Sequence, residues 1–445
     1  MASMSSVLLT DLYQLTMLQG YFDEGMEETA VFEFFIRKRP PERNFFMAAG
    51  LASLLGYLER LQFTPPELEW LAGTGRFTDD FIAALSRLRF SGDVDAMPEG
   101  TVFFPNEPIV RVTAPLPQAQ LIETRLINLL HFQTLIASKA ARSVLAAPGK
   151  LLIDFGLRRA HGAEAGLTAA RACYLAGFAG SSNVLAESVD GVPSFGTMAH
   201  SFVQAHEEEA EAFLRFARAQ PNNVVFLIDT YDTEGAAAKV VSIAPQLKQE
   251  GILIRGVRLD SGDLADHAKK VRRILDQGGL AEVKIWASGN LDEQVVRDLL
   301  AAGAPIDGFG IGSRLDTSAD VPYLDCAYKL QEYAGRARRK RSEGKATWPG
   351  RKQVHRRTGP DGRMAEDLLT LESDPQEGEA LIRPVMRAGR RLAPSPSLAE
   401  SRRRAAAELD RLPESLRRLG EAAPYPVRIS ASLQALAEEV DRRSR

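Results

Sequence analysis

Short apolar runs that end in acidic or small residues recur through the middle of the chain, and they limit its fold more than any other feature. Most of them precede a stretch of alanine, leucine and charged residues that is typical of a helix. The later runs are about thirty residues apart, which is the length of one strand–helix unit. Apolar strands that alternate with helices form a buried parallel sheet, so six such units favour a closed or nearly closed α/β barrel. The runs are KLLIDFG, SSNVLA, NVVFLIDT, IRGVRLDSG, VKIWASGN and IDGFGIGS.

The segments on either side of this repeat have a different pattern. Residues 1–125 alternate between helical and strand signals, which predicts a separate N-terminal α/β domain, and a long amphipathic helix is expected over about 117–147. The barrel domain is predicted over residues 126–334, and residues 335–445 are expected to complete the N-terminal domain. The basic stretch AGRARRKRSEGKATWPGRKQVHRR within that last segment predicts a solvated hairpin or loop.

Composition excludes several classes of protein. The 445 residues exceed the usual length of one domain, and 45% hydrophobic with 25% charged residues is typical of soluble globular proteins. A net charge of -3 gives no reason to expect a nucleic-acid or membrane partner. The two cysteines, Cys173 and Cys326, form neither a metal-binding spacing nor a disulfide framework, which favours the cytoplasm. No apolar stretch is long enough to span a membrane, and the N-terminus is a poor signal peptide.

Acidic and small residues stand where the predicted strands end. Barrel enzymes build their active sites from the carboxyl ends of several strands, so clusters on five strands favour a site on this rim. Each cluster taken alone is equally consistent with helix capping, because Asp, Ser and Asn are preferred caps. The clusters are Asp154-Phe155-Gly156, Asp229-Thr230, Asp260-Ser261-Gly262, Ser288-Gly289-Asn290 and Gly310 with Gly312 and Ser313.

Two of these clusters indicate binding of an anionic sugar phosphate. Gly310, Gly312 and Ser313 would let backbone N–H groups approach a phosphate, although a tight barrel turn is the alternative. The chain contains neither a Walker A motif nor a dinucleotide-binding GxGxxG after a strand. Arg258 and Asp260 stand two apart, so their side chains are expected on one side of a strand. Such a pair can hold an anion and sugar hydroxyls, or it can be a buried ion pair.

His200 follows a Gly-Thr turn in the segment SFGTMAHSFVQAHEEE, and the chain has only six histidines. Its spacing from His206 does not match the HExxH pattern of zinc proteases, and its context is not the nucleophile elbow of hydrolases. A loop histidine is ordinarily a polar turn residue, and His206 and His131 fall in predicted helices. The residues by themselves therefore leave the role of His200 open.

Taken together and in order, eight stretches over roughly residues 8–355 resemble the nicotinate phosphoribosyltransferase family. The resemblance implies a type II phosphoribosyltransferase with an N-terminal α/β domain, an incomplete α/β barrel and a homodimeric assembly with shared active sites. It implies the transfer of phosphoribose from phosphoribosyl pyrophosphate to nicotinate, with ATP hydrolysed alongside and Mg²⁺ required. The stretches are TDLYQLTM, FEFFIRKRP, FPNEPIVRV, DFGLRRAHG, GTMAHSFVQAHE, VRLDSGDL, GIGS and SEGKATWPGRKQV.

The same resemblance implies roles for thirteen residues, whereas it names no magnesium ligands. It makes His200 the residue that ATP phosphorylates and Asp260 the partner of the ribose hydroxyls. Among the substrate-binding residues, nicotinate would contact Tyr13 of the partner subunit, Phe155, Ser182 and Thr197. Arg258 would pair with the nicotinate carboxylate or with the phosphoribosyl group, and Arg158 would contact the anionic region of the phosphates. The phosphates would contact Arg37 from the partner subunit together with Gly289, Gly310, Gly312 and Ser313.

One position distinguishes nicotinate from nicotinamide as the substrate. Nicotinamide phosphoribosyltransferases carry an acidic residue near the second barrel strand, where this chain has Ser181 and Ser182. A carboxylate there would repel nicotinate, so the serines favour the acid over the alternative, nicotinamide phosphoribosyltransferase. Two further classes are compatible with the fold: a sugar-phosphate aldolase or isomerase that uses Lys284 as a Schiff base, and a non-catalytic nucleotide-binding protein.

Overall fold

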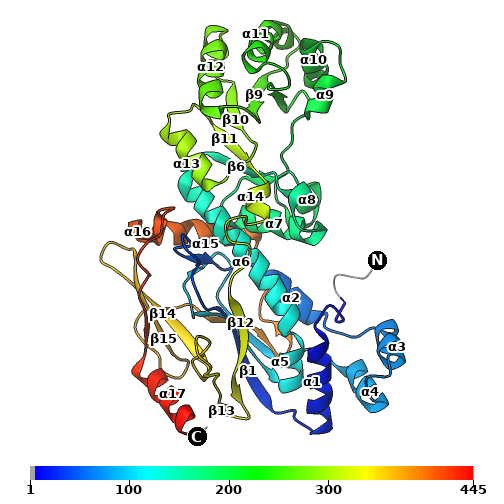
Figure 1. Cartoon of the computed structure of the whole chain (residues 1–445), viewed down its shortest axis with the longest axis vertical. Coiled ribbons are helices and arrows are strands. Elements are labelled where there is room, and N and C mark those ends of the chain that lie inside the picture. The colour runs from blue at the N-terminus through cyan, green and yellow to red at the C-terminus, as the bar shows by residue number, and fades with distance from the viewer. Residues whose placement is uncertain (1–5, 444–445) are drawn as a thin grey trace. The chain divides into compact units, whose positions relative to one another are not determined.

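The computed structural model describes residues 6–443, and the chain divides into two compact units (Figure 1). Unit 1 comprises Met1–Ser138 with Tyr323–Arg445, and unit 2 comprises Lys139–Pro322. Among the described residues, no helix is both long enough and apolar enough to cross a membrane.

Unit 2 is built on a six-stranded sheet in which every pairing is parallel. The strand order is β7-β6-β11-β10-β9-β8, and the edge strands β7 and β8 do not pair with each other. The barrel is therefore incomplete, and the predicted fold class is confirmed. The strands are β6 (Leu151–Asp154), β7 (Gly180–Ser181), β8 (Val224–Leu227), β9 (Ile254–Leu259), β10 (Lys284–Ala287) and β11 (Gly308–Ile311).

Helices connect the strands of unit 2, and their starts follow the capping rules of the sequence. Asp232, Asp263 and Asp292 each accept hydrogen bonds from backbone N–H groups in the first helical turn, so capping explains these three acidic residues. The helices are η1 (Leu157–Arg159), α7 (Ala163–Ala176), α8 (Val184–Asp190), α9 (His200–Gln204), α10 (Glu209–Ala219), α11 (Thr233–Gln249), α12 (Leu264–Gln277), α13 (Glu293–Ala301) and α14 (Ser313–Asp316).

Two predicted elements need correction. The run SSNVLA was expected to be a strand, but only Ser181 belongs to one, because Asn183 caps α8 and the next residues are helical. The long helix expected over about 117–147 is interrupted at Ile122, which separates α5 (Leu116–Leu121) from α6 (Glu123–Ala146).

Unit 1 contains a seven-stranded antiparallel sheet with the order β13-β12-β1-β5-β3-β17-β18. A four-stranded sheet, β16-β14-β15-β19, and the pair β2-β4 complete the strands. Their bounds are β1 (Thr29–Ile36), β2 (Phe46–Met47), β3 (Asp93–Ala96), β4 (Val102–Phe103), β5 (Pro108–Pro115), β12 (Cys326–Tyr333), β13 (Arg336–Ala337), β14 (Lys352–Thr358), β15 (Met364–Leu371), β16 (Glu379–Ala380), β17 (Arg383–Arg387), β18 (Arg390–Arg391) and β19 (Val427–Ile429). The other helices are α1 (Leu12–Asp23), α2 (Leu51–Glu59), α3 (Pro65–Gly73), α4 (Asp79–Arg87), α15 (Leu398–Arg411), α16 (Glu414–Arg417) and α17 (Ala431–Arg443).

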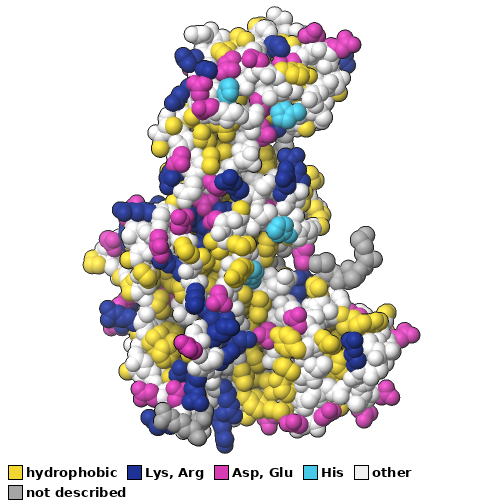
Figure 2. All heavy atoms as spheres, viewed as in Figure 1, with side chains coloured by type: hydrophobic (Ala, Val, Ile, Leu, Met, Phe, Trp, Pro, Cys, Tyr) yellow, Lys and Arg dark blue, Asp and Glu magenta, His cyan; other side chains and the backbone are white. Residues whose placement is uncertain are grey.

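The basic stretch of unit 1 is solvated only in its first part. Figure 2 shows lysine and arginine side chains gathered over the part of unit 1 where Figure 1 labels β12 and β13. Further along, Lys352 and Arg356 are buried in β14 and pair with carboxylates, Lys352 with Glu33 at 2.7 Å. The predicted solvated loop is therefore wrong for this part, because buried acids from distant segments neutralise these cations.

Candidate active site

The five clusters predicted at the strand ends lie at the carboxyl ends of their strands in unit 2 or directly after them. Asp154 is the last residue of β6, and Asp260 comes directly after β9. Hydrogen bonds link the clusters of three strands, since Asp229, after β8, accepts from the backbone N–H of Asp260 at 3.1 Å. Ser288, after β10, donates to Oδ1 of Asp260 at 2.5 Å. The parallel sheet therefore brings these polar side chains together on one rim.

Arg258 is the residue on this rim with the most polar contacts. Its guanidinium donates to the Thr197 hydroxyl at 3.2 Å, to the Met198 carbonyl at 2.9 Å and to the Ser288 hydroxyl at 3.0 Å. It also forms an ion pair with Asp260 at 3.3 Å, and its side chain is only 13% exposed. Burial lowers the pKa of Arg258, but an arginine stays charged at neutral pH. A cation is thus fixed in one orientation where an anionic ligand would need it.

His200 begins α9, and its imidazole is oriented by a neighbouring rim residue. Its Nδ1 lies 3.1 Å from the Thr230 hydroxyl, which follows β8. Within residues 6–443, Nε2 of His200 has no hydrogen-bond partner. If Nδ1 carries the proton and donates it to Thr230, Nε2 presents a lone pair, as a nucleophilic imidazole requires.

Phe155 lies against two of the predicted phosphate-binding glycines. A Cβ atom at Gly310 would lie 2.5 Å from its ring, and one at Gly312 would lie 2.8 Å from its carbonyl oxygen. The Arg258 Cζ atom lies 6.0 Å from the centre of the same ring. Glycine at 310 therefore lets the aromatic ring approach β11 closely, and glycine at 312 leaves room for the Phe155 carbonyl. At Gly289, where φ is +90°, a Cβ atom would overlap the Asp260 carbonyl oxygen.

Comparison with known proteins identifies the family of the chain that carries this rim. The model of the nicotinate phosphoribosyltransferase N-terminal domain matches residues 8–131, the family model matches residues 151–345, and the C-terminal domain model matches residues 374–437. The chain is 48% identical to nicotinate phosphoribosyltransferase pncB2 of Mycobacterium tuberculosis over 95% of its own length and 91% of the relative. The chain belongs to the nicotinate phosphoribosyltransferase family. It is also 39% identical to the Bacillus subtilis nicotinate phosphoribosyltransferase, over 84% of this chain and 78% of that one.

Solved structures agree with this family. The crystal structure of human nicotinic acid phosphoribosyltransferase superposes with a TM-score of 0.86 at 32% identity, over 97% of this chain and 99% of that one. A nicotinate-nucleotide pyrophosphorylase from Pyrococcus furiosus, at 23% identity and a TM-score of 0.75 over 92% and 97% of the two chains, shares the fold. The predicted family and its nicotinate phosphoribosyltransferase activity are thus confirmed, whereas the roles of individual residues stay predictions.

Two predicted substrate residues of this nicotinate phosphoribosyltransferase family member belong to unit 1. Tyr13 is on α1, is 46% exposed and donates its hydroxyl to Glu123 at 3.4 Å. Arg37 follows β1 and forms an ion pair with Asp325 at 3.0 Å. The other eleven predicted site residues lie in unit 2, where Arg158 is exposed on η1.

The two serines predicted to favour nicotinate differ in their surroundings. Ser181 is buried and donates its hydroxyl to the Asp154 carboxylate at 2.7 Å. Ser182 is half-buried, its backbone N–H donates to the Asp154 carbonyl at 2.8 Å, and its hydroxyl makes no hydrogen bond within the described residues. The hydroxyl of Ser182 is therefore the one that stays available to a ligand.

Lys284 is in the wrong place for a Schiff base. It is the first residue of β10, its side chain is 55% exposed, and it pairs with Asp307 at 3.5 Å. The rim residues stand at the opposite, carboxyl ends of the strands. This placement removes the structural basis of the aldolase or isomerase alternative.

Three rim residues had no predicted role. Asp229 was grouped with the rim in the sequence, but within residues 6–443 its Oδ1 is buried without a hydrogen-bond donor, and its Oδ2 accepts from the Ser261 hydroxyl at 2.5 Å. Thr230 orients His200, and Asp316 on α14 is buried beside the Phe155 turn. The position after an apolar strand was a signal for Asp229, whereas nothing in the sequence pointed to Asp316.

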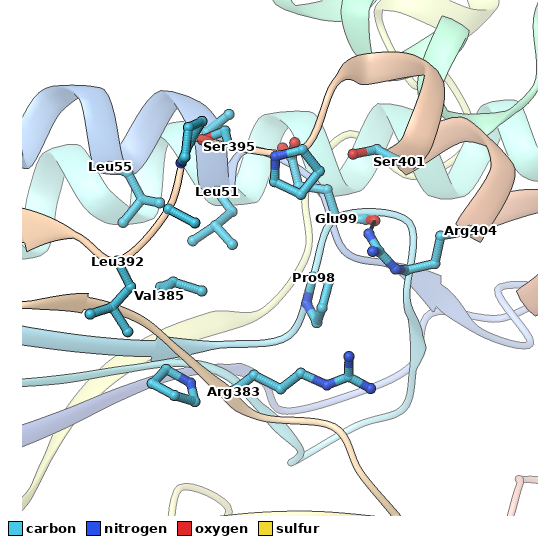
Figure 3. Close-up of a pocket in the computed structure, with 15 residues that line it drawn as sticks. Leu51, Leu55, Pro98, Glu99, Arg383, Val385, Leu392, Ser395, Ser401 and Arg404 are labelled. Atoms are coloured by element: carbon cyan, nitrogen blue, oxygen red, sulfur yellow. Dashed lines mark hydrogen bonds between the residues drawn. The ribbon is translucent and has the colours of Figure 1, made fainter.

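Unit 1 contains a cavity of about 230 Å³ that includes none of the predicted site residues. Leu51 and Leu55 of α2 lie toward one side of the cavity together with Val385 and Leu392, and Glu99 and Arg404 lie toward the other side (Figure 3). Glu99 accepts from the backbone N–H of Gly50, and Arg404 donates to the Glu99 carbonyl. These polar groups are engaged with the backbone of unit 1.

Proposed function

We propose that this chain joins nicotinate to the ribose of phosphoribosyl pyrophosphate and couples the reaction to ATP hydrolysis through His200. The products are nicotinate mononucleotide and pyrophosphate, and the reaction is the first step of NAD salvage from nicotinate. The observation that carries the proposal is the set of contacts that fixes Arg258 among Thr197, Ser288 and Asp260. The reaction is assigned to the cytoplasm, in keeping with two unpaired cysteines.

Nicotinate is flat and anionic, and the rim contains an aromatic ring that can stack on it and cations that can pair with its charge. The pyridine ring would stack between Phe155 and Tyr13 of the partner subunit, and the carboxylate would pair with Arg258. Thr197 and Ser182 present hydroxyls to the ring, while Arg158 adds positive charge on the same rim. A neutral amide would not gain the same charge pairing, which favours nicotinate over nicotinamide.

The transfer breaks the bond from ribose C1 to the pyrophosphate oxygen and forms a bond from the pyridine nitrogen to C1. Positive charge develops on the sugar, and negative charge develops on the leaving group. Asp260 would hold the ribose hydroxyls, and Gly289, Gly310, Gly312 and Ser313 would hold the phosphate of the ribose. Arg37 of the partner subunit would contact the phosphates. The protein then acts by alignment and charge stabilisation, without a covalent sugar intermediate.

ATP would enter the cycle at His200. A bond forms between Nε2 and the γ-phosphorus, and the bond from that phosphorus to its bridging oxygen breaks, which releases ADP. Thr230 supports this step by holding Nδ1 and leaving Nε2 available. Phosphate on the imidazole adds negative charge at the rim, and its later hydrolysis would draw the reaction toward product.

The residues of the rim also fit Mg²⁺. This ion usually takes one or two protein carboxylates together with phosphate oxygens, and no group of three or more candidate ligands lies together within residues 6–443. Asp229 suits such a role because its buried Oδ1 has no hydrogen-bond donor in the part of the chain that the structure describes. When bound, the ion would neutralise charge on the pyrophosphate.

A homodimer would explain exposed apolar side chains on both units. In unit 1, Leu12 and Tyr13 of α1 are 49% and 46% exposed, and in unit 2, Val184, Leu185 and Val189 of α8 are 72%, 56% and 57% exposed. Several large apolar side chains exposed on one helix, as on α8, are typical of a protein interface. Leu185→Glu should shift a dimer toward monomer in sedimentation, and an unchanged dimer would remove α8 from the interface.

The His200→Ala variant tests the coupling. It should still bind nicotinate, but it should lose both nicotinate-dependent ATP hydrolysis and the stimulation of mononucleotide formation by ATP. His206→Ala is the matched control, because that imidazole contacts the Phe202 carbonyl and is not on the rim. Full ATP stimulation in His200→Ala, or label from γ-labelled ATP on another side chain, would refute the phosphohistidine.

Turnover with nicotinamide in place of nicotinate tests the choice of substrate. The wild-type protein should use nicotinate and should not use nicotinamide at comparable rates. Ser182→Asp places a carboxylate at the ring and should raise the KM for nicotinate. Equal use of both substrates by the wild type would contradict the role given to Ser182.

A further inference from the structure

Two carboxyl groups are buried together under the turn that carries Phe155. Asp154, at the end of β6, has no exposed surface, and Asp316, at the end of α14, is 1% exposed. In the part of the chain that the structure describes, neither forms an ion pair with lysine or arginine. Two buried ionised carboxylates without a cation would repel each other strongly, so their arrangement requires an explanation.

Both groups contact the turn directly. Oδ1 of Asp154 accepts the backbone N–H of Gly156 at 2.7 Å. The Asp316 carboxyl lies so close to the Gly156 Cα atom that a Cβ atom at this position would overlap it. The position of Gly156 fixes that of its neighbour Phe155, whose ring already lies against Gly310. The two carboxyl groups therefore pack against the turn that positions the Phe155 ring.

The hydrogen bonds of the two acids are unequal. Oδ2 of Asp154 accepts from the Ser181 hydroxyl at 2.7 Å, so both of its oxygens have donors. Neither oxygen of Asp316 has a donor within the described residues. An ionised Asp316 would leave a buried charge without a partner, whereas a protonated Asp316 has its own O–H to donate to Asp154.

We infer that Asp154 and Asp316 hold one proton between them, carried by Asp316, and that this neutralised pair positions Phe155 for nicotinate. Only the second part of this inference, the positioning of Phe155 for nicotinate, rests on the proposed function. Asp316 is a positioning residue, since it acts through the turn and does not touch the substrate. A shared proton makes the pair monoanionic, which the Ser181 and Gly156 donors can stabilise.

Burial and the neighbouring Asp154 carboxylate both raise the pKa of Asp316 well above its usual range, in agreement with this assignment. The titratable group that faces the pair from α7 is Cys173, and burial raises the pKa of that thiol well above its usual range. Arg171 on the same helix pairs with Asp190 at 4.0 Å. From η1, Arg158 and Arg159 are exposed, and Arg314 on α14 itself pairs with Asp292.

The protonation is tested without any substrate, by thermal unfolding of the whole chain as a function of pH. In the wild type, the folded state holds the Asp316 proton more tightly than the unfolded chain does. Its contribution to stability is therefore lost as the pH rises from about 4 through the folded-state pKa. Asp316→Asn is neutral at all pH values, so its Tm minus that of the wild type should increase from about pH 5 to about pH 8. A difference that stays constant or decreases over this range would show that Asp316 is already ionised in the folded protein, and it would overturn the inference.

The positioning is tested by steady-state kinetics with both substrates. Asp316→Leu has no donor for Asp154 and should raise the KM for nicotinate about tenfold, with little change in the KM for phosphoribosyl pyrophosphate. Asp316→Asn, whose amide can donate to Asp154, should restore the nicotinate KM to within about twofold. Asp298→Asn, an exposed carboxylate on α13, is the control and should change neither constant.

The unfolding experiment and the kinetic experiment together distinguish a failure of the proposed function from a failure of the inference. Absence of turnover by the wild type would refute the proposed function, and the pH dependence of unfolding would then decide by itself whether Asp316 carries the proton. Equal nicotinate KM values for Asp316→Leu, Asp316→Asn and wild type would refute the positioning. If Asp316→Leu fails to fold, a tenfold rise in nicotinate KM for Asp316→Asn would still overturn the inference.

Discussion

Arg258 and Asp260 form an ion pair at 3.3 Å where β9 ends, and the same aspartate oxygen accepts from Ser288 after β10. The contact joins the predicted carboxylate-binding cation to the predicted ribose-binding acid. Because each group is held by the other, neither has to reorganise when an anionic ligand arrives. Rigidity at this pair is therefore the property that the first prediction tests.

Arg258→Lys should leave the protein folded and lower kcat/KM for nicotinate by about ten- to hundredfold. A lysine cannot reach Thr197, Met198 and Ser288 at once, and each hydrogen bond to a charged group contributes about 1.5–3 kcal/mol. Steady-state kinetics measure the effect. Arg297→Lys on α13, where the arginine is 50% exposed and pairs with adjacent Asp298, should change nothing. Wild-type kinetics for Arg258→Lys would show that the hydrogen bonds of the guanidinium to Thr197, Met198 and Ser288 are dispensable.

Gly310→Ala should raise the KM for nicotinate about tenfold, which corresponds to about 1.4 kcal/mol. The added Cβ atom would lie 2.5 Å from the Phe155 ring and would displace it from β11. Gly73→Ala, whose Cβ atom would meet nothing within 4 Å, is the control. A rise confined to the KM for phosphoribosyl pyrophosphate would instead support a role of Gly310 in the phosphate cradle alone.

Arg356→Met should destabilise unit 1 by about 3–5 kcal/mol, because it leaves buried acids without their cation. Arg356 pairs with Asp367 at 2.6 Å and with Glu408 at 2.9 Å, and its side chain and that of Asp367 are fully buried. The midpoint of urea unfolding, followed by tryptophan fluorescence, measures the change. The adjacent Arg357, which is 41% exposed and pairs with Glu366, provides the matched control Arg357→Met, and its midpoint should stay near that of the wild type.

His131 should make unit 1 sensitive to acid. Its Nε2 accepts the backbone N–H of Leu324 at 2.9 Å, and burial lowers the pKa of His131. A lowered folded-state pKa means that the stability is present above about pH 6.5 and is lost as the pH falls through the folded-state value. The Tm of the wild type minus that of His131→Gln should therefore fall between about pH 7.5 and pH 5. The exposed His161, changed to Gln, should show no such trend.

Sequence patterns identified the family and the parallel barrel because both can be recognised from short contiguous stretches: the motifs in one case and the apolar runs in the other. An apolar run of four residues followed by an acidic or small residue marks a buried strand and its rim without any knowledge of distant contacts. The same local pattern failed at SSNVLA, where Asn183 caps a helix and the apolar Val184 and Leu185 are exposed. Length and hydrophobicity could not separate a short strand from a helix start in that run.

The sequence by itself determined which chemical groups stand at the ends of the strands: Phe155, Arg258, Asp260 and the glycines after β11. Only the tertiary structure decided which of these groups touch, since Thr197, Thr230 and Ser288 reach their partners from other segments. It also decided that Arg356 is buried and that Asp316 lies under Gly156. The physical reason is that burial and pairing depend on groups far apart along the chain, and these groups meet only when the sheets have formed.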